Sequence, residues 1–162
     1  MYPEMYHEEV IYQNPFLCMR IWRLEGSEQS EEELRRRREH VFGKDGDGMN
    51  WHYHKEVEFL LIDHGELTVL LPEEQLVLRE GDIAVFGSSE PHITFQSTTA
   101  RLNYYVMQID LEKHMDQSSV TNMKYFSEVL RPLSKLNYIF TDNAEAKRAA
   151  YELILEIYEE MG

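Results

Sequence analysis

Short apolar segments separated by turn residues run through the middle of the chain and restrict its fold class. Glycine, proline and acidic residues punctuate them, and Gly65 can take the positive φ that a tight turn requires. Short strands at such regular spacing are typical of antiparallel sandwiches and barrels. The sequence therefore predicts a mainly β fold. The expected strands are residues 16–24, 57–62, 67–71, 76–79, 83–86, 92–96 and 101–109.

Potential metal ligands lie at the start of the second of these segments. His52, His54 and Glu58 are separated by even numbers of residues. Because successive side chains of a strand alternate between its faces, the three would point into one space if the strand is continuous or only gently bent. Two imidazoles and a carboxylate are ligands that zinc, nickel, manganese or iron accepts. The spacing therefore predicts a site for one divalent ion.

A helical insertion is expected around residues 30–42. Ser30 followed by Glu33 is a capping-box signature, and glutamates precede arginines by four residues along the same segment. The basic run at 35–38 could bind an anion or nucleic acid. The neighbouring acids neutralise it, however, so a surface helix is the favoured interpretation.

Further helices are expected after residue 110. We expect residues 123–135 to be helical as far as a break near Pro132, and Asp142 followed by Glu145 predicts the start of a final helix. Apolar residues recur in that helix at intervals of three and four. This stripe fits packing on the barrel and a dimer interface equally well. Its members are Ala146, Ala149, Ala150, Leu153, Ile154, Ile157 and Met161.

Charge and cysteine content narrow the function classes. The net charge is −14, with 30 acidic against 16 basic residues, which argues against direct binding of a nucleic-acid backbone by these 162 residues. The single cysteine, Cys18, excludes an internal disulfide and favours a reducing compartment. The N-terminus lacks a secretion signal pattern, and no apolar run is long enough to span a bilayer. We therefore expect a soluble cytoplasmic protein.

The central stretch resembles the cupin family. Its first motif is complete, with Gly46, His52, His54, Glu58 and Gly65 at the family spacing. The second motif is degenerate but keeps its glycine and its histidine. The positions in question are Gly81 and His92, which match, and Gly87, Ser89 and Gln96, which stand where proline, glycine and asparagine are expected. The resemblance implies a double-stranded β-helix, or jelly-roll barrel, and His92 as a fourth metal ligand.

More narrowly, the sequence is similar to the N-terminal ligand-binding and dimerisation domain of AraC-type transcription regulators. The similar segments read HYHKEVEFLLI and GDIAVFGSSEPHITF. The resemblance implies a sensor barrel over residues 1–110 and a helical dimerisation and linker region over residues 111–162. It also implies a helix-turn-helix DNA-binding domain after residue 162, so we expect a fragment of a longer homodimeric regulator, with a natural stand-alone cupin as the other possibility.

Two functions are compatible with this site. The favoured one is a sensor that binds a small polar effector, such as a sugar, and contacts DNA only through the missing domain. The alternative is a stand-alone metal-dependent cupin enzyme, a dioxygenase or isomerase. No acid or base outside the ligand set stands out, which favours the sensor and leaves no predicted catalytic residue. The predicted ligands of the ion are His52, His54, Glu58 and His92. The same four residues could instead hydrogen-bond the effector directly. Further predicted effector contacts are Gln96 and Trp51.

Overall fold

A computed structural model describes residues 5–42, 51–114 and 132–161 of the protein. The strands are β1 (Tyr6–His7), β2 (Met19–Gly26), β3 (His52–Tyr53), β4 (Val57–His64), β5 (Glu66–Leu70), β6 (Gln75–Arg79), β7 (Ile83–Phe86), β8 (Ile93–Gln96) and β9 (Leu102–Ile109). The helices are α1 (Glu31–Phe42), α2 (Leu111–His114), the 3₁₀ helix η2 (Leu133–Leu136), α4 (Tyr138–Asp142) and α5 (Ala144–Met161).

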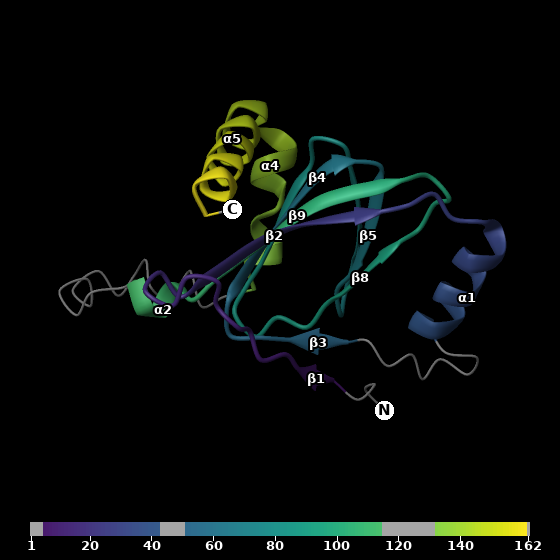
Figure 1. The fold of residues 1–162 in the computed structure, drawn as a ribbon, viewed down its shortest axis with the longest axis horizontal. Coiled ribbons are helices and arrows are strands. Elements are labelled where there is room, and N and C mark those ends of the chain that lie inside the picture. Colours follow the sequence, from purple (N-terminus) through teal and green to yellow (C-terminus); the bar gives the residue numbers. More distant parts are fainter. Residues whose placement is uncertain (1–4, 43–50, 115–131, 162) are drawn as a thin grey trace.

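Two antiparallel sheets build the barrel (Figure 1). One has the strand order β2-β9-β4-β7 and the other the order β6-β5-β8. The short strands β1 and β3 form a separate parallel pair, so the N-terminal arm, which we define as residues 5–13, is tied to the barrel by its first strand. The predicted mainly β fold with a barrel and C-terminal helices is confirmed.

Strand β4 is buried on both faces, so its successive side chains pack into two different parts of the molecule. Leu60 and Ile62 point into the barrel, where they join an apolar cluster with residues of β5 and β7. Leu61 points to the opposite face and packs under the C-terminal helix. Glu58 has the same parity as Leu60, so its carboxylate also faces the barrel interior. The polar site therefore lies on the same face of β4 as the apolar core.

Helix α5 covers the outer face of the four-stranded sheet. Ile154 is 3% exposed and packs against Leu61 and Met107. Ala150, Ile157 and Met161 of the predicted apolar stripe join the same cluster, whereas Leu153 is 57% exposed. Most of the stripe is therefore explained by packing on the barrel. None of the described helices is long and apolar enough to cross a bilayer.

The local signals at helix ends are reproduced with one correction. At α1, the backbone N–H of Glu33 donates to Oγ of Ser30, and the backbone N–H of Ser30 donates to the Glu33 carboxylate, as the predicted capping box requires. At α5, the residue that caps the first turn is Asn143, whose Oδ1 accepts the backbone N–H of Ala146 at 3.0 Å. The predicted cap, Asp142, is instead the last residue of α4.

The first long strand begins later than predicted. Residues 16–18 form a turn before β2, because Oδ1 of Asn14 accepts the backbone N–H groups of Phe16 and Leu17, both at 3.1 Å. Most of the predicted helix at 123–135, together with Gly46 and the loop around it, lies outside the described residues.

Turn geometry at Gly65 agrees with the sequence. Its φ is +89°, and a Cβ at this position would lie 2.2 Å from the carbonyl oxygen of Arg101. Only glycine satisfies both conditions.

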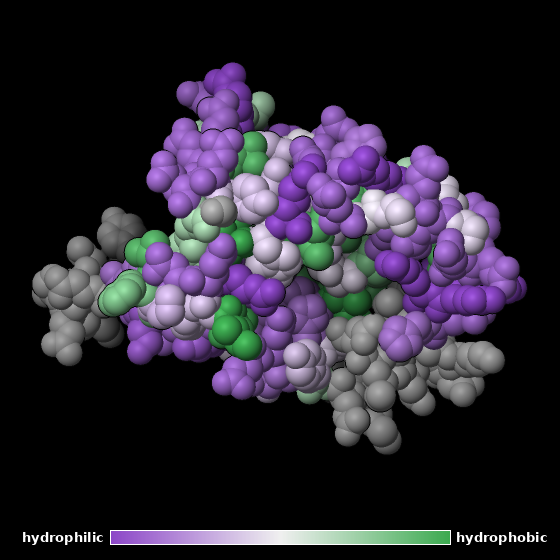
Figure 2. Space-filling view, in the orientation of Figure 1, coloured by the Kyte–Doolittle hydropathy of each residue, from purple (hydrophilic) through white to green (hydrophobic). Residues whose placement is uncertain are grey.

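The molecular surface agrees with the acidic composition. The face drawn in Figure 2 is largely hydrophilic, with apolar residues in small separate patches. Two of the most exposed large apolar side chains, Ile11 and Phe16, belong to the arm and to the turn that follows it.

Candidate metal centre

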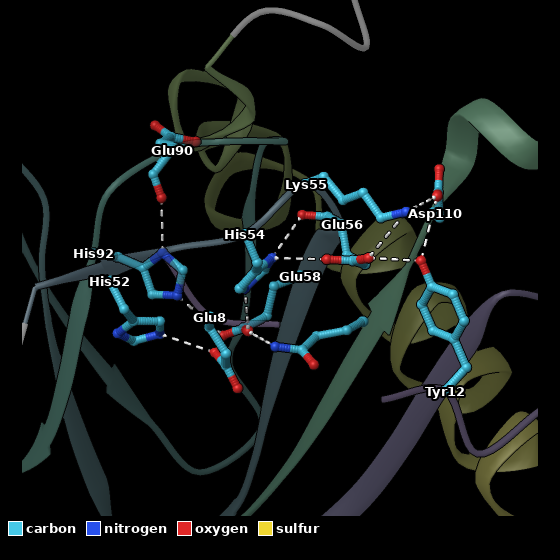
Figure 3. Close-up of polar contacts among 11 residues, drawn as sticks. Glu8, Tyr12, His52, His54, Lys55, Glu56, Glu58, Glu90, His92 and Asp110 are labelled. Atoms are coloured by element: carbon cyan, nitrogen blue, oxygen red, sulfur yellow. Dashed lines mark hydrogen bonds and ion pairs between the residues drawn. The ribbon is translucent and has the colours of Figure 1, made fainter. Parts of the chain in front are cut away.

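Three histidines meet at one end of the barrel interior (Figure 3). The ligand nitrogens of His52, His54 and His92 all lie within 4.8 Å of one another. His52 belongs to β3, and His92 directly precedes β8. The two residues exchange backbone hydrogen bonds of 3.2 and 3.0 Å, so main-chain pairing holds their side chains together.

Glu58 completes the predicted set. Its Oε2 lies 3.0 Å from Nε2 of His54, and its Oε1 lies 3.5 Å from Nε2 of His92. The segment is not one continuous strand, because β3 ends at Tyr53 and β4 begins at Val57. The bend between them still allows His54 and Glu58 to converge. All four predicted ligands are therefore in one cluster.

Backbone carbonyls orient two of the imidazoles. Nδ1 of His54 lies 3.0 Å from the carbonyl oxygen of Glu56, and Nδ1 of His92 lies 2.9 Å from that of Glu90. A carbonyl oxygen only accepts hydrogen bonds, so each Nδ1 carries a proton and each Nε2 faces the shared space. Metal-binding histidines are commonly oriented in this way.

The carboxylate of Glu58 and the imidazole of His92 shift each other's pKa. Burial acts to raise the pKa of Glu58, but contacts with His54 and His92 outweigh it and hold this pKa far below its ordinary value. Burial acts to lower the pKa of His92, yet the adjacent Glu58 carboxylate raises it overall. The Glu58 carboxylate therefore favours positive charge at the imidazoles, and a divalent cation could supply that charge.

The donor atoms fit a bound metal ion. Among the described residues, Nε2 of His92 and Oε1 of Gln108 are buried and have no hydrogen-bond partner. The 3.5 Å contact of His92 with Glu58 is too long to satisfy the ring nitrogen. Leaving a buried polar group unsatisfied costs about 1–3 kcal/mol, so a bound group at this position is expected. Three imidazoles and a carboxylate suit zinc, nickel, manganese or iron.

A cavity of about 390 Å³ opens beside the cluster. This volume is sufficient for a small molecule. Burial, followed by the charge of Glu58, raises the pKa of Tyr104 to about 12, so this hydroxyl keeps its proton at neutral pH. The polar lining consists of Glu8, His52, Glu58, Thr94, Tyr104 and Gln108, and the apolar lining includes Tyr6, Trp22, Leu60 and Val106.

The structure places the two additional predicted effector contacts outside the cavity lining. Nε2 of Gln96 donates to the carbonyl oxygens of Thr98 and Ala100 at 3.2 and 2.7 Å, so this side chain supports the loop before β9. Four residues of extended chain separate it from His92, roughly 13 Å, which removes it from the cluster. Trp51 instead meets the arm, because its carbonyl oxygen accepts the Tyr6 N–H at 2.9 Å.

The degenerate second motif keeps a glycine-like backbone. Ser89 has a φ of +60°, a conformation that glycine adopts at no steric cost. Its N–H donates to the carbonyl oxygen of His54 at 2.7 Å. The loop that carries His92 is thereby attached to the segment that carries the other ligands.

Other groups at the site were missed by sequence reasoning. Glu8 arrives from the arm, and its Oε2 lies 3.7 Å from Nε2 of His52. Gln108 is the register partner of Glu58 on β9 and donates to Oε2 of that residue at 2.9 Å. Glu56 shares the parity of His54 and Glu58, which was an available signal. Strand pairing brings Glu8 and Gln108 into the site, and no local sequence pattern predicts that pairing.

Comparison with known proteins gives a family match over the central part of the chain. Residues 39–107 match the family model of the cupin domain, and no curated protein matches the chain significantly. A cupin-2 domain protein from Shewanella frigidimarina is 11% identical over 57% of this chain and 71% of that chain, with a TM-score of 0.39. A cupin-like protein from Thermotoga maritima is 11% identical over 60% and 61%, with a TM-score of 0.43.

A structure of an HTH_3 family transcriptional regulator from Vibrio cholerae is also similar. It is 13% identical over 62% of this chain, with a TM-score of 0.42, and the match covers 47% of the regulator's length. The matched family segment, residues 39–107, contains all four predicted metal ligands. The family match over residues 39–107 and the antiparallel barrel both agree with the cupin fold expected from the sequence.

Proposed function

We propose that this chain is the ligand-sensing and dimerisation domain of an AraC-type transcription regulator. A small polar effector, such as a sugar, binds in the cavity beside one divalent ion held by the histidines and Glu58. The observation that carries the proposal is that the cavity is lined both by the cluster and by Tyr6 and Glu8 of the arm. A molecule in the cavity therefore contacts both the ion site and the N-terminal arm.

The site is also connected to the C-terminal helices. The backbone carbonyl of Glu90 accepts from His92, while its carboxylate accepts the N–H of Ser134 at 3.2 Å and the hydroxyl of the same serine. Ser134 lies in η2, next to the helices assigned to dimerisation. Effector binding shifts a regulator only if the effector prefers one arrangement energetically. Contacts to the arm and, through His92, to η2 provide two places where such a preference can arise.

A divalent ion held by His52, His54, Glu58 and His92 would supply a Lewis-acidic centre for the oxygen atoms of an effector. The chain's own residues supply the rest. Tyr104 donates from its hydroxyl, and the unpaired Oε1 of Gln108 accepts from an effector hydroxyl.

The alternative function is a metal-dependent enzyme, and one observation favours it. The His52 side chain is 21% exposed and lines the cavity, so a substrate there would lie against the open side of a bound ion. Tyr104, with a pKa of about 12, is a hydrogen-bond donor and not a base at neutral pH. The lining therefore offers more for binding than for proton transfer, which favours the sensor.

Metal loading followed by a ligand screen tests the proposal. Metal-free wild-type protein is expected to bind one Zn²⁺, Ni²⁺, Mn²⁺ or Fe²⁺ per chain, whereas His54→Ala is expected to lose this binding. The matched control is His64→Ala, because His64 is an exposed histidine paired with Glu80. Hydroxylated compounds are then screened for an increase in the melting temperature of the loaded protein. Consumption of the stabilising compound would overturn the sensor function in favour of the enzyme.

A further inference from the structure

The arm presents alternate residues to the cavity. Tyr6 and Glu8 line it, whereas the ring of His7 packs against Tyr53 with centroids 5.2 Å apart. The N–H of Tyr6 donates to the carbonyl of Trp51, and the N–H of Glu8 donates to that of Tyr53, both at 2.9 Å. Main-chain hydrogen bonds to the β3 segment therefore determine which arm side chain faces the histidines.

The carboxylate of Glu8 lies near one histidine of the cluster, His52. Its Oε2 is 3.7 Å from Nε2 of His52, the contact drawn as a dashed line in Figure 3. With metal–ligand bonds of about 2.1 Å, two ligands of one ion are separated by about 3.4 Å in a tetrahedral site and by at most about 4.2 Å. The observed separation lies between these two values.

The charge around Glu8 supports the same role. Among the residues that the structure describes, no lysine or arginine forms an ion pair with it, and its partner within 4 Å is the imidazole of His52, which is charged only when protonated. The Glu8 side chain is 26% exposed, so its carboxylate is partly removed from water. A carboxylate in this position is stabilised most by a cation at the histidine cluster.

We propose that Glu8 is an additional ligand of the metal ion, beyond the four cupin ligands, so that metal loading fastens the arm over the cavity. The inference rests on the proposed metal site. It has a quantitative consequence, because the coupling between two binding events is reciprocal. The factor by which Glu8 strengthens metal binding equals the factor by which the metal stabilises the attached arm.

The first measurement compares the metal affinity of three proteins. Metal-free wild type, Glu8→Gln and Glu9→Gln are titrated with Zn²⁺ against a chelator of known affinity. Loss of a ligand is expected to weaken binding at least about tenfold in Glu8→Gln. Glu9→Gln removes the same charge from the adjacent exposed residue and is expected to bind within about twofold of wild type.

The second readout is hydrogen exchange at the amides of Tyr6 and Glu8. Zn²⁺ is expected to slow their exchange in wild type and Glu9→Gln by the factor measured in the affinity comparison, and to leave it unchanged in Glu8→Gln. Equal affinities for wild type and Glu8→Gln would overturn the inference and leave the metal site intact. Equal weakening in both variants would also overturn it, because it would show a general charge effect. If wild type binds no metal at all, the proposed metal site itself fails.

Discussion

Two polar clusters are buried next to each other around the segment that joins β3 to β4, and they are completed in different ways (Figure 3). The lysine cluster consists of Tyr12, Lys55, Glu56 and Asp110. Nζ of Lys55 lies 2.8 Å from Oδ2 of Asp110, and the Tyr12 hydroxyl donates to Oε1 of Glu56 at 2.7 Å. Hydrogen bonding to Asp110 raises the pKa of Lys55. This cluster satisfies its own groups.

The histidine cluster consists of His52, His54, Glu58, His92 and Gln108, and it does not close on itself. Nε2 of His92 and Oε1 of Gln108 have no hydrogen-bond partner among the described residues. Buried polar groups in folded proteins are normally paired. The contrast indicates that the lysine cluster holds the arm and strands together, whereas the histidine cluster has unpaired polar atoms that a bound group would satisfy.

The largest loss of unfolding free energy is expected when the lysine cluster is disrupted. Lys55→Met leaves the Glu56 and Asp110 carboxylates buried without their cation. Removing one partner of a buried ion pair costs about 3–5 kcal/mol, and because Lys55 itself is half exposed we expect about 3 kcal/mol. Urea unfolding measures the loss.

A matched lysine provides the control. The side chains of Lys55 and Lys135 are 57% and 56% exposed, but Lys135 pairs with Glu73 and Glu74 on the surface. Lys135→Met is expected to cost much less than Lys55→Met, because ion pairs on the surface are screened by water and contribute little to stability. Similar losses in both variants would show that the buried carboxylates do not distinguish the two sites.

Acid should weaken the lysine cluster next. Burial acts to raise the pKa of Asp110, but Lys55 outweighs it and holds this pKa below the ordinary value of 3.8. The stabilisation is therefore present above pH 3.8 and is lost as the pH falls through the lower folded pKa. Asp110→Asn is expected to flatten the dependence of unfolding free energy on pH below 4, measured by denaturation at several pH values. An unchanged slope would contradict this role.

The smallest expected effect lies in the histidine cluster. In the metal-free protein, Gln108→Leu removes an unsatisfied acceptor together with one hydrogen bond to Glu58, so the unfolding free energy should change by less than about 1 kcal/mol. Gln96→Leu is the control, because that buried amide donates to two carbonyls and should cost about 2 kcal/mol. Equal losses would mean that the two clusters are equally complete.

Local patterns predicted the parts of the molecule that depend on neighbouring residues. The strand segments, the capping box at Ser30 and the turn at Gly65 all follow from short-range backbone preferences. The turn at residues 16–18 was missed because an asparagine side chain competes with strand pairing there. The cap of α5 was misplaced by one residue, because Asp142 and Asn143 are both suitable caps and packing selects between them.

The sequence by itself determined the donor types at His52, His54 and Glu58, and alternation along an extended backbone predicted that they could share one face. The tertiary structure decided which distant groups meet them. Glu56 and Glu58 have the same chemistry, the same parity and nearly complete burial. One joins Tyr12 and Lys55 and the other joins the histidines, because the bend between β3 and β4 and the register with β9 place them against different partners.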